Sequence, residues 1–323
     1  MAKRELLILR HGKSDWDTGD TDFRRPLKNR GKRAAQRMGV WLWQQELRPD
    51  LVISSPAERA INTAHKCCKS MDVPVSTIIK DERIYMASLD ALLAVLADAP
   101  GESQRILLVG HNPGLENLLM YLTDHDVVYG TDGKLLPTAT LAHLEMPEQW
   151  QDLAPGCATL HAVRRPRELP RGFPWPAPRG EEIRERPAYY YTQSAVIPYR
   201  INENGEAEFL VVGASSKNHW VVPKGIKEPE LSPQESAARE AWEEGGVHGE
   251  VETRRLGHYK VNKWGARCSV DVYAMRVDEV LDDEHWEESH RRRRWLPAQQ
   301  AAKDLKQPEL RCMLLELAER LGS

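Results

Sequence analysis

The second half of the chain contains Arg239-Glu240-Ala241-Trp242-Glu243-Glu244-Gly245-Gly246-Val247, which follows Pro223-Lys224-Gly225. The residues between the two stretches predict the start of a helix, because Ser232 can cap it and Glu235 can complete a capping box. Glycine is the residue that most often ends a helix in the left-handed conformation. We therefore expect a helix over 232–244 that ends at the paired glycines.

Three glutamates of this helix are expected to share one side. Glu240 precedes Glu243 by three residues and Glu244 by four, and side chains at these spacings are neighbours on a helix surface. Clustered carboxylates repel one another unless a cation compensates them, and hard oxygen ligands favour Mg²⁺ or Mn²⁺. Such an ion can bridge a pyrophosphate and activate water. The alternative interpretation is a solvated acidic helix face.

The sequence around this helix favours a domain with more strands than helices. Alternating or continuous apolar runs bounded by turn residues indicate strands, and a final amphipathic run indicates a second helix. The expected strands are 194–200, 208–213, 220–222, 251–259 and 268–276, and the expected final helix is 309–321.

These features together resemble a Nudix box, and the resemblance covers about residues 187–323. The residues that carry it are Gly225, Arg239, Glu240, Glu243, Glu244 and Gly246. The resemblance implies an α/β/α sandwich that hydrolyses a nucleoside or polyol diphosphate linked to another group. It also implies that the three glutamates bind Mg²⁺ or Mn²⁺, with the carbonyl of Gly225 as a further ligand.

One residue departs from this pattern. The family has a glutamate six residues after the first glycine, where this chain has Leu231, and that glutamate orients the arginine of the box. Glu235 lies four residues before Arg239 on the same helix, so we expect Glu235 to replace it, with Glu230 as the alternative. On this hypothesis Glu235→Gln lowers metal-dependent turnover more than Glu230→Gln does.

The run 284–296 near the end of the chain narrows the expected substrate. Together with Pro223-Lys224-Gly225 it resembles the branch that hydrolyses diphosphoinositol and diadenosine polyphosphates. Such anionic substrates need cations. The candidates are Lys224, Lys227, Arg292 and Arg294, and Glu287 or Glu288 is the candidate general base or additional metal ligand. A solvated basic run beside an acidic one is the alternative.

The first half of the chain alternates short aliphatic runs with helical patterns. This alternation predicts a mainly parallel sheet with helices on both faces. The expected strands are 5–9, 51–54 and 105–109, followed by 138–144 and 159–163, and the expected helices are 31–45, 58–70, 88–97 and 114–122.

Three motifs follow three of these strands directly. Arg10-His11-Gly12 follows the first, 54–60 with Arg59 follows the second, and Gly110-His111-Asn112-Pro113-Gly114 follows the third. In a parallel sheet these motifs would meet at the carboxyl ends of the strands, where ligands bind. An imidazole there can attack phosphorus, and arginines can hold the phosphoryl oxygens without a metal. Each residue alone is more often structural.

The same motifs, with Leu9 before the first and Ser54–Ala64 for the second, resemble the histidine phosphatase superfamily over roughly residues 3–170. Arg25-Pro26-Leu27, with Gly31 after it, resembles the phosphohistidine phosphatase (SixA-type) branch. The resemblance implies a three-layer α/β domain that needs no cofactor, with His11 as nucleophile. It places Arg10, Arg59 and His111 in the phosphate pocket, with Arg25 as an additional pocket arginine. For the general acid two alternatives remain: Glu82, or a site that works without one.

The organisation expected from these patterns is a phosphatase domain over 1–167, a Pro/Arg-rich linker over 168–186 and a Nudix domain over 187–323. The basic residues of the linker could bind phosphate, although a solvated linker is the preferred interpretation. A chain of 323 residues usually divides into two domains. Its formal net charge of −3 and lack of a long apolar stretch predict a cytoplasmic protein with no nucleic-acid or membrane partner.

Two functional hypotheses remain from the sequence. The first is a bifunctional enzyme that cleaves a phosphoanhydride at one site and removes phosphate from a monoester or phosphohistidine at the other. The second is a signalling regulator that dephosphorylates a phosphohistidine-carrying protein and uses its Nudix half as a weakly active nucleotide sensor. The partners are small phosphorylated molecules in the first case and a protein in the second.

Overall fold

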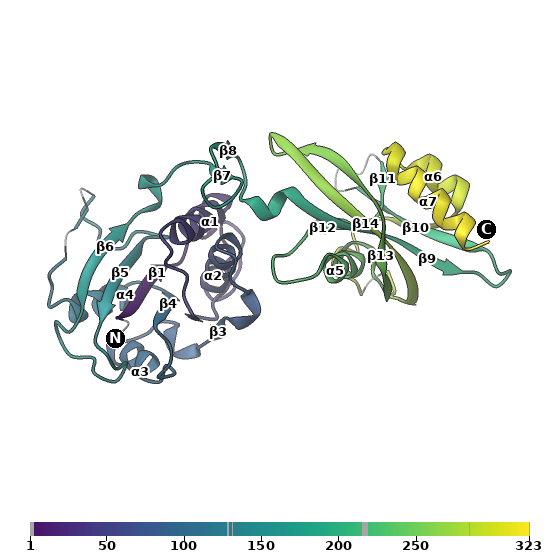
Figure 1. The fold of residues 1–323 in the computed structure, drawn as a ribbon. Helices are drawn as coiled ribbons and strands as arrows, with labels where there is room; N and C mark the ends of the chain where they lie inside the picture. The colour runs from purple at the N-terminus through teal and green to yellow at the C-terminus, as the bar shows by residue number, and fades with distance from the viewer. Residues whose placement is uncertain (1–2, 128, 131, 215–218, 284, 323) are drawn as a thin grey trace. The chain divides into compact units, whose positions relative to one another are not determined.

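The computed structural model describes residues 3–127, 129–130, 132–214, 219–283 and 285–322. The chain divides into two compact units, Met1–Ile183 and Arg184–Ser323 (Figure 1). Most of the Pro/Arg-rich segment 168–186 therefore belongs to the first unit. Within the described residues, no helix has both the length and the apolar character needed to cross a bilayer.

The first unit contains a six-stranded sheet with the order β3-β2-β4-β1-β5-β6. The four strands β3, β2, β4 and β1 are parallel, and β5 and β6 continue the sheet antiparallel. The strands are β1 Arg4–Arg10, β2 Leu51–Ser54, β3 Ile79–Lys80, β4 Arg105–Gly110, β5 Leu141–Met146 and β6 Thr159–Arg164. The helices are α1 Asn29–Gln44, α2 Glu58–Ser70, α3 Leu89–Ala97 and α4 Gly114–Leu122.

Helices cover both faces of this sheet. Successive side chains of a strand point to opposite faces. Leu6 and Ile8 accordingly pack with α3 and α4, whereas Leu7 and Leu9 pack with α1 and α2. All four leucine and isoleucine side chains are fully buried. The expected three-layer α/β domain is confirmed.

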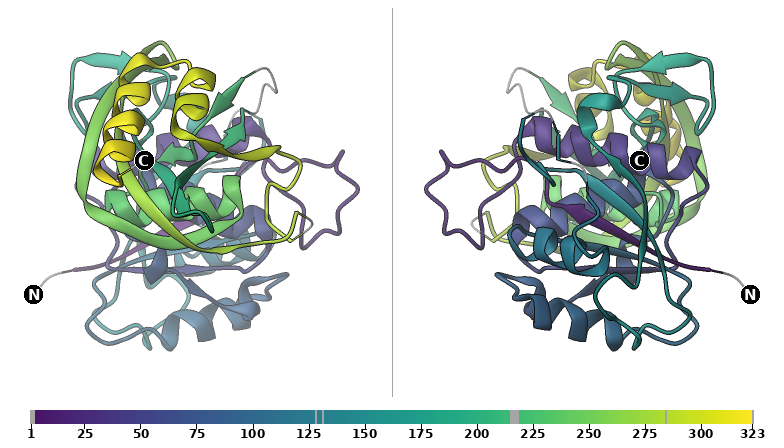
Figure 2. Two further views of the ribbon diagram at one scale, coloured as in Figure 1. Left: turned by 90° about the vertical axis from the view of Figure 1, so that its right-hand side faces the viewer. Right: turned by 90° about the vertical axis from the view of Figure 1, so that its left-hand side faces the viewer.

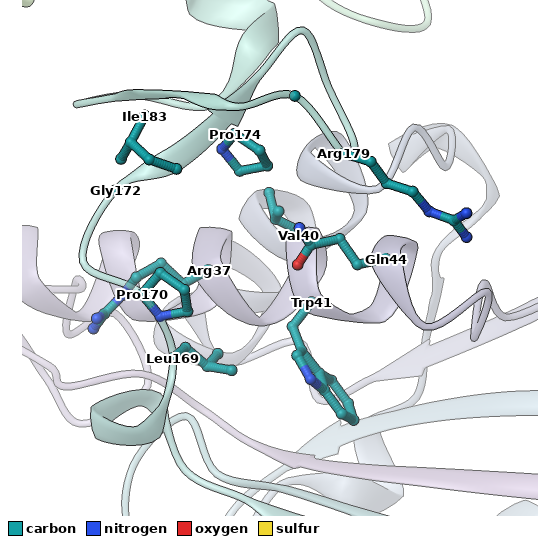
Figure 3. A pocket seen from close by; sticks show the side chains of 11 residues that line it. Arg37, Val40, Trp41, Gln44, Leu169, Pro170, Gly172, Pro174, Arg179 and Ile183 are labelled. Carbon is teal, nitrogen blue, oxygen red and sulfur yellow. The ribbon is translucent and has the colours of Figure 1, made fainter.

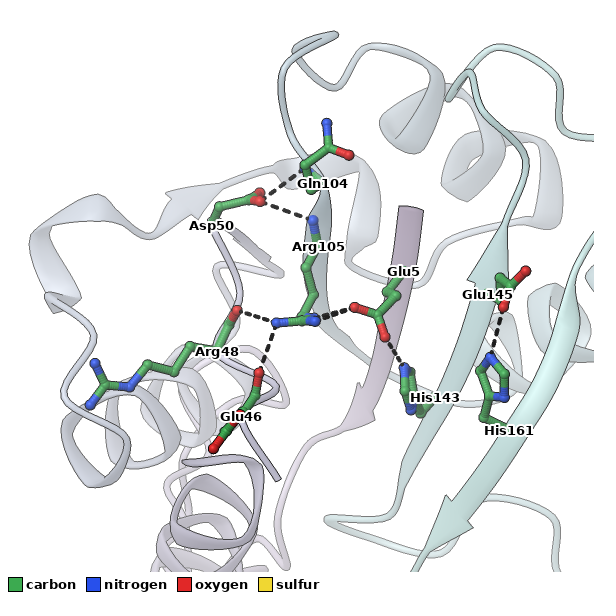
Figure 4. A network of polar contacts seen from close by, with 9 residues as sticks. All are labelled: Glu5, Glu46, Arg48, Asp50, Gln104, Arg105, His143, Glu145 and His161. Carbon is green, nitrogen blue, oxygen red and sulfur yellow. Dashed lines mark hydrogen bonds and ion pairs between the residues drawn. The ribbon is translucent and has the colours of Figure 1, made fainter. Parts of the chain in front are cut away.

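Polar contacts link β1, β4 and β5 near the amino ends of β1 and β4, at the edge opposite the three strand-end motifs (Figure 4). The guanidinium of Arg105 donates to the Glu5 carboxylate at 2.6 Å and to the backbone carbonyls of Glu46 and Arg48 at 3.1 and 3.0 Å. Glu5 also contacts His143 Nε2 at 2.7 Å. These contacts tie β1, β4 and β5 together at this edge.

The segment after β6, expected as a linker, is folded onto α1. It forms the short turn Pro166–Glu168 and the paired strands β7 Phe173–Trp175 and β8 Glu182–Arg184. Leu169 and Phe173 are buried, and Gln44 of α1 donates to the Pro178 carbonyl at 3.0 Å. Figure 3 shows this segment crossing over Val40 and Gln44. Its two apolar anchors explain why a proline-rich segment packs here.

The second unit contains a mixed sheet with the order β11-β10-β9-β14-β13, to which β12 and β15 add. Its strands are β9 Thr192–Ile201, β10 Ala207–Gly213, β11 Trp220–Val221, β12 Lys224–Ile226, β13 Val247–Lys263, β14 Ala266–Val280 and β15 Arg293–Pro297. Its helices are α5 Pro233–Gly245, α6 Ala298–Asp304 and α7 Pro308–Arg320.

Helices again lie on both faces. Val196 of β9 packs with α5, whereas its neighbour Ile197 packs with α6 and α7. Figure 2 shows α7, in yellow, beside the long strands β13 and β14. The expected α/β/α sandwich is confirmed. The strand and helix patterns did not reveal α6, β12 or β15.

Candidate active sites

The two histidines of the strand-end motifs lie side by side in the first unit. Arg10 and Gly110 are register partners of the parallel strands β1 and β4, so His11 and His111 leave the sheet at neighbouring points. The centroids of their rings are 5.0 Å apart. Each histidine is 8 % exposed. The sheet register therefore brings together two motifs that are 100 residues apart in sequence.

The contacts of His11 select its tautomer. Its Nδ1 lies 2.7 Å from the carbonyl oxygen of Gly12, which can only accept a hydrogen bond. Nδ1 must therefore carry the proton, and Nε2 keeps its lone pair for attack on phosphorus. The Gly12 N–H donates to Thr63 Oγ1 of α2 at 2.9 Å, which holds the loop. Glycine is required at position 31, because a Cβ there would overlap the Lys13 carbonyl.

Arg25 and Arg59 converge on one carboxylate. Arg59 Nη2 lies 2.9 Å from Asp22 Oδ2, and Arg25 Nη2 contacts Asp22 Oδ1. The Tyr85 hydroxyl donates to the same carboxylate at 2.9 Å, and the Tyr85 ring packs edge-on against His111. Sequence reasoning missed Asp22 and Tyr85, because neither belongs to a strand-end motif.

Several buried side-chain nitrogen atoms of this group have no hydrogen-bond partner among the described residues. They are Nε of Arg10, Arg25 and Arg59 and Nδ1 of His111. Leaving buried polar atoms unsatisfied is costly. An anion with several acceptor oxygens, such as a phosphoryl group, would satisfy them, so the arrangement suits phosphate chemistry.

The structure does not bring Glu82 into this group. Glu82 is the first residue of the short turn Glu82–Ile84 and is exposed, with its neighbour Arg83 paired to Asp81 and Asp98. Tyr85 occupies the position near His111 instead. This placement favours a site in which no glutamate serves as the general acid.

Burial keeps both histidines neutral at physiological pH. Burial, together with the charges of Arg59, Arg10 and Arg25, lowers the pKa of His11 to about 4, although its contact with Gly12 opposes the shift. Burial and the neighbouring His11 lower the pKa of His111 to about 3. Proton binding is disfavoured in the folded state, so both rings stay uncharged above about pH 5.

We expect an NMR titration of the full chain to show this directly. The imidazole resonances of His11 and His111, assigned with the two alanine variants, should not shift between pH 8 and 5, whereas a reference peptide titrates near pH 6.5. A midpoint of 6.5 or higher for His11 would contradict the buried, neutral nucleophile.

The second site is built on α5. The Ser232 side chain accepts from the Glu235 backbone N–H at 3.1 Å, and Glu235 Oε2 accepts from the Ser232 N–H at 2.7 Å, so the expected capping box is present. Gly246 follows the helix with a φ of +61°, and a Cβ there would crowd Trp286. Glycine is therefore required at this helix end.

The three glutamates have different surroundings. Glu240 lies directly against Gly225 of β12, where any Cβ would overlap its carboxylate. Glu244 accepts from the Lys224 backbone N–H at 3.0 Å and pairs with Arg291 at 2.8 Å. Glu243 pairs with Arg239 at 2.6 Å.

The charge balance of this cluster fits a divalent cation. Burial and the carboxylates of Glu244 and Glu243 raise the pKa of Glu240 to about 8. Within the described residues, no three Asp, Glu, His or Cys side chains are already arranged as metal ligands. Buried carboxylate oxygens that repel one another nevertheless form the donor set that Mg²⁺ and Mn²⁺ prefer. The residues present therefore fit such an ion.

Arg291 is a residue that sequence reasoning missed. It contacts Glu244 and Glu288 at once, and the Glu288 N–H donates to the Glu243 carbonyl at 3.2 Å. Glu288 therefore adjoins the cluster, whereas Glu287 is exposed. Glu284, the first residue of the run 284–296, lies outside the described residues.

The expected substrate cations are distributed over both faces of the sheet. Lys224 lies beside the cluster, where burial lowers its pKa and the Glu244 carboxylate opposes that shift. Arg294 is opposite Val211 in the β10–β15 pair, on the α6–α7 face, and Arg292 and Arg294 both lie over the Trp220 ring. The structure does not bring these two arginines to the carboxylates. Lys227 contacts the Pro229 carbonyl at 3.4 Å.

The expectation that Glu235 orients Arg239 is wrong. The Glu235 carboxylate is held in the capping box, and Arg239 Nε donates to Glu243 four residues later. The hydrogen bond with Glu243 is the largest cause that raises the pKa of Arg239, and the charge of Glu228 contributes less.

We expect Glu235→Gln to leave turnover unchanged, because glutamine also completes a capping box. Glu235→Ala should lower the free energy of unfolding by about 1 kcal/mol, since it removes that contact. Thermal denaturation and assays of both variants check this expectation. A large loss of turnover in Glu235→Gln would restore the original assignment.

Comparisons with known proteins match each of the two units separately. A model of the histidine phosphatase superfamily (branch 1) matches residues 6–84, and a model of the NUDIX domain matches 191–317. An uncharacterised protein of Mycobacterium tuberculosis is 32% identical over 167 residues, 49% of this chain and 100% of the relative. Diphosphoinositol polyphosphate phosphohydrolase 3-beta of Bos taurus is 34% identical over 122 residues, 37% of this chain and 71% of the relative.

Two solved structures are similar to one unit each. The protein histidine phosphatase SixA in complex with tungstate is 22% identical with a TM-score of 0.43, and the match covers 51% of this chain and 98% of that one. A C. elegans Ap4A hydrolase is 22% identical with a TM-score of 0.35, over 41% of this chain and 98% of that one.

Proposed function

Because the chain belongs to the histidine phosphatase superfamily in its first unit and to the Nudix family in its second, we propose that it is a bifunctional phosphohydrolase. Both families are hydrolases, so the chain is an enzyme that combines a phosphatase with a Nudix hydrolase. The observation that carries the proposal is the pair of separate clusters, one of buried phosphate-binding cations around His11 and one of carboxylates on α5.

At the first site, His11 Nε2 attacks the phosphorus atom and the bond to the leaving group breaks. Arg10, Arg25, Arg59 and His111 hold the phosphoryl oxygens during this transfer. Water then attacks the phosphohistidine, releasing phosphate and restoring His11. The imidazole of a phosphohistidine leaves easily because it is readily protonated. A site without a general acid therefore favours phosphohistidine or activated esters as substrates. The side chains around His11 can perform this transfer without a metal.

At the second site, Glu240, Glu243 and Glu244 would hold Mg²⁺ or Mn²⁺, which would neutralise the phosphates and polarise a phosphoanhydride. The Glu288 carboxylate, which adjoins this cluster, can accept a proton from the attacking water. The Lys224 ammonium can bind a phosphate oxygen. Arg291 keeps Glu244 and Glu288 in place through its two contacts.

We infer that the Nudix substrate is a nucleotide, a dinucleoside polyphosphate or an inositol pyrophosphate. The similarity to a diphosphoinositol polyphosphate phosphohydrolase supports this class. The alternative is a signalling regulator in which the phosphatase acts on a phosphohistidine-carrying protein and the Nudix unit senses a nucleotide. That alternative rests on Leu231, which replaces the glutamate that the family uses to orient Arg239.

Chelation tests the division of labour in the full chain. We expect EDTA to stop hydrolysis of inositol pyrophosphate or diadenosine tetraphosphate and to leave phosphatase activity unchanged, because only the second site depends on a cation. Added Mg²⁺ should restore hydrolysis of the phosphoanhydride. Equal EDTA sensitivity of both activities would overturn the proposal, and absence of turnover on every phosphoanhydride would favour the sensor.

A further inference from the structure

The first unit contains a cavity of about 390 Å³ that the phosphatase chemistry does not use. Its walls are the loop after His11, the first turns of α1, the segment 137–140 and the turn 165–167. Five of its lining side chains are basic and one is acidic. The basic residues are Lys13, Arg30, Arg37, Arg165 and Arg167, and we call this space the basic cavity.

The positive charge of the basic cavity is only partly compensated. Asp132 lies 3.0 Å from Arg165 and 3.9 Å from Arg167, so one carboxylate serves two arginines. No ion pair of Lys13, Arg30 or Arg37 exists among the described residues. The walls therefore hold three cations for which the described part of the chain supplies no anion.

Two buried polar atoms of the basic cavity have no partner among the described residues. Thr140 is fully buried, and its Oγ1 makes no hydrogen bond there. Nε of Arg37 is in the same situation. Burial and the charges of Arg33 and Arg171 lower the pKa of Arg37, which shows that further cations surround it. Arg37 also lines a neighbouring cavity between α1 and the segment 169–183, and Figure 3, which draws that cavity, shows Arg37 extending past Pro170 and away from Gln44.

The basic cavity lies behind the nucleophile loop. The Ala139 N–H donates to the carbonyls of Arg10 and His11 at 3.1 and 3.0 Å, so 137–140 is bonded to the backbone of that loop. The side chains that lead into the phosphatase pocket, Arg25, Arg59 and His111, do not line the cavity. The cavity is therefore a separate space.

We propose that the basic cavity is a binding site for a small molecule with several phosphate groups. Five cations around a concave space suit several phosphate oxygens, and arginine binds phosphate through paired donors. Thr140 and Arg37 supply buried donors for the same oxygens. The turn 165–167, which directly precedes the segment that the sequence favoured as a solvated linker, thereby contributes to a site. Binding there requires no turnover at either active site.

Calorimetric titration of the full chain with inorganic tripolyphosphate in EDTA tests this proposal. EDTA removes metal-bridged binding at α5. Arg30→Gln/Arg167→Gln removes two exposed cations of the cavity, and Lys32→Gln/Lys80→Gln removes the same charge at exposed positions outside it. We expect the first pair to weaken binding at least about 10-fold and the control pair to change it less than about 2-fold.

A second measurement separates this cavity from the phosphatase pocket. Orthovanadate inhibition of the phosphatase should change less than about 2-fold in Arg30→Gln/Arg167→Gln, because neither residue contacts the His11 group. Unchanged tripolyphosphate affinity in that variant would overturn the proposal. So would a parallel loss of vanadate inhibition, since both anions would then share one pocket. The calorimetric result does not depend on either enzymatic activity. The activity assays therefore test the proposed function separately from this proposal.

Discussion

Replacing His11 by alanine is expected to lower the phosphatase rate at least about 1,000-fold, a loss of roughly 4 kcal/mol of transition-state stabilisation. The contact with Gly12 occupies Nδ1 of His11, so Nε2 is the ring nitrogen of His11 that keeps a lone pair for attack. Alanine removes the nucleophile, and the remaining cations can only bind phosphate.

The Nudix activity of the same variant provides the control. Hydrolysis of a phosphoanhydride by the full chain should stay at the wild-type rate, because the α5 carboxylates belong to the other unit. Acid-labile phosphate, trapped on wild type by a rapid acid quench, should be absent from His11→Ala. Retention of wild-type phosphatase activity would show that another group accepts the phosphoryl group.

Replacing Glu244 by glutamine is expected to lower Mg²⁺-dependent hydrolysis at least about 100-fold, roughly 3 kcal/mol. The Glu244 carboxylate touches the Lys224 N–H and Arg291 in addition to its expected metal. Glutamine keeps the size of the side chain but loses the charge. Glu243→Gln should act in the same direction, because its carboxylate also pairs with Arg239.

Glu235→Gln is the matched control for this experiment. It makes the same chemical change on the same helix, at a side chain that serves the helix cap. Circular dichroism and the phosphatase rate of each variant show whether the chain is folded. If Glu244→Gln turns over like Glu235→Gln, the α5 carboxylates do not hold the metal.

Much of the first site follows from the sequence, because its residues are adjacent to strands. A strand that ends at Arg10 and a parallel neighbour that ends at Gly110 leave little freedom for His11 and His111. Asp22 and Tyr85 could not be predicted in this way. They reach the arginines from an irregular loop and a turn, whose paths depend on packing rather than on periodicity.

The arginines of β15 show a second limit. Side chains of a strand alternate between faces, so a shift of one residue exchanges the two sets. The sequence suggested Arg292 and Arg294 for the substrate, but the pairing of β15 with β10 directs Arg293 toward α5 and Arg294 toward α6 and α7. Nothing in a run of arginines fixes that register.

Glu235 shows a competition that the sequence did contain. Ser232 and Glu235 already had the spacing of a capping box, and the same carboxylate was also assigned to Arg239. A helix start leaves backbone N–H groups without partners, and a side chain that satisfies one of them is not available to a second partner. The cap therefore takes the carboxylate.

The Asp22 carboxylate gives the resting phosphatase pocket an internal counterion. Arg25 and Arg59 are both buried, and together they would repel one another if no anion lay between them. A phosphoryl group that binds Arg25 and Arg59 therefore competes with this carboxylate for the same two guanidinium groups. The net affinity of the pocket for phosphate is then the difference between binding phosphate and binding the Asp22 carboxylate, so we expect inorganic phosphate to leave more readily than the charge of the two arginines alone would allow.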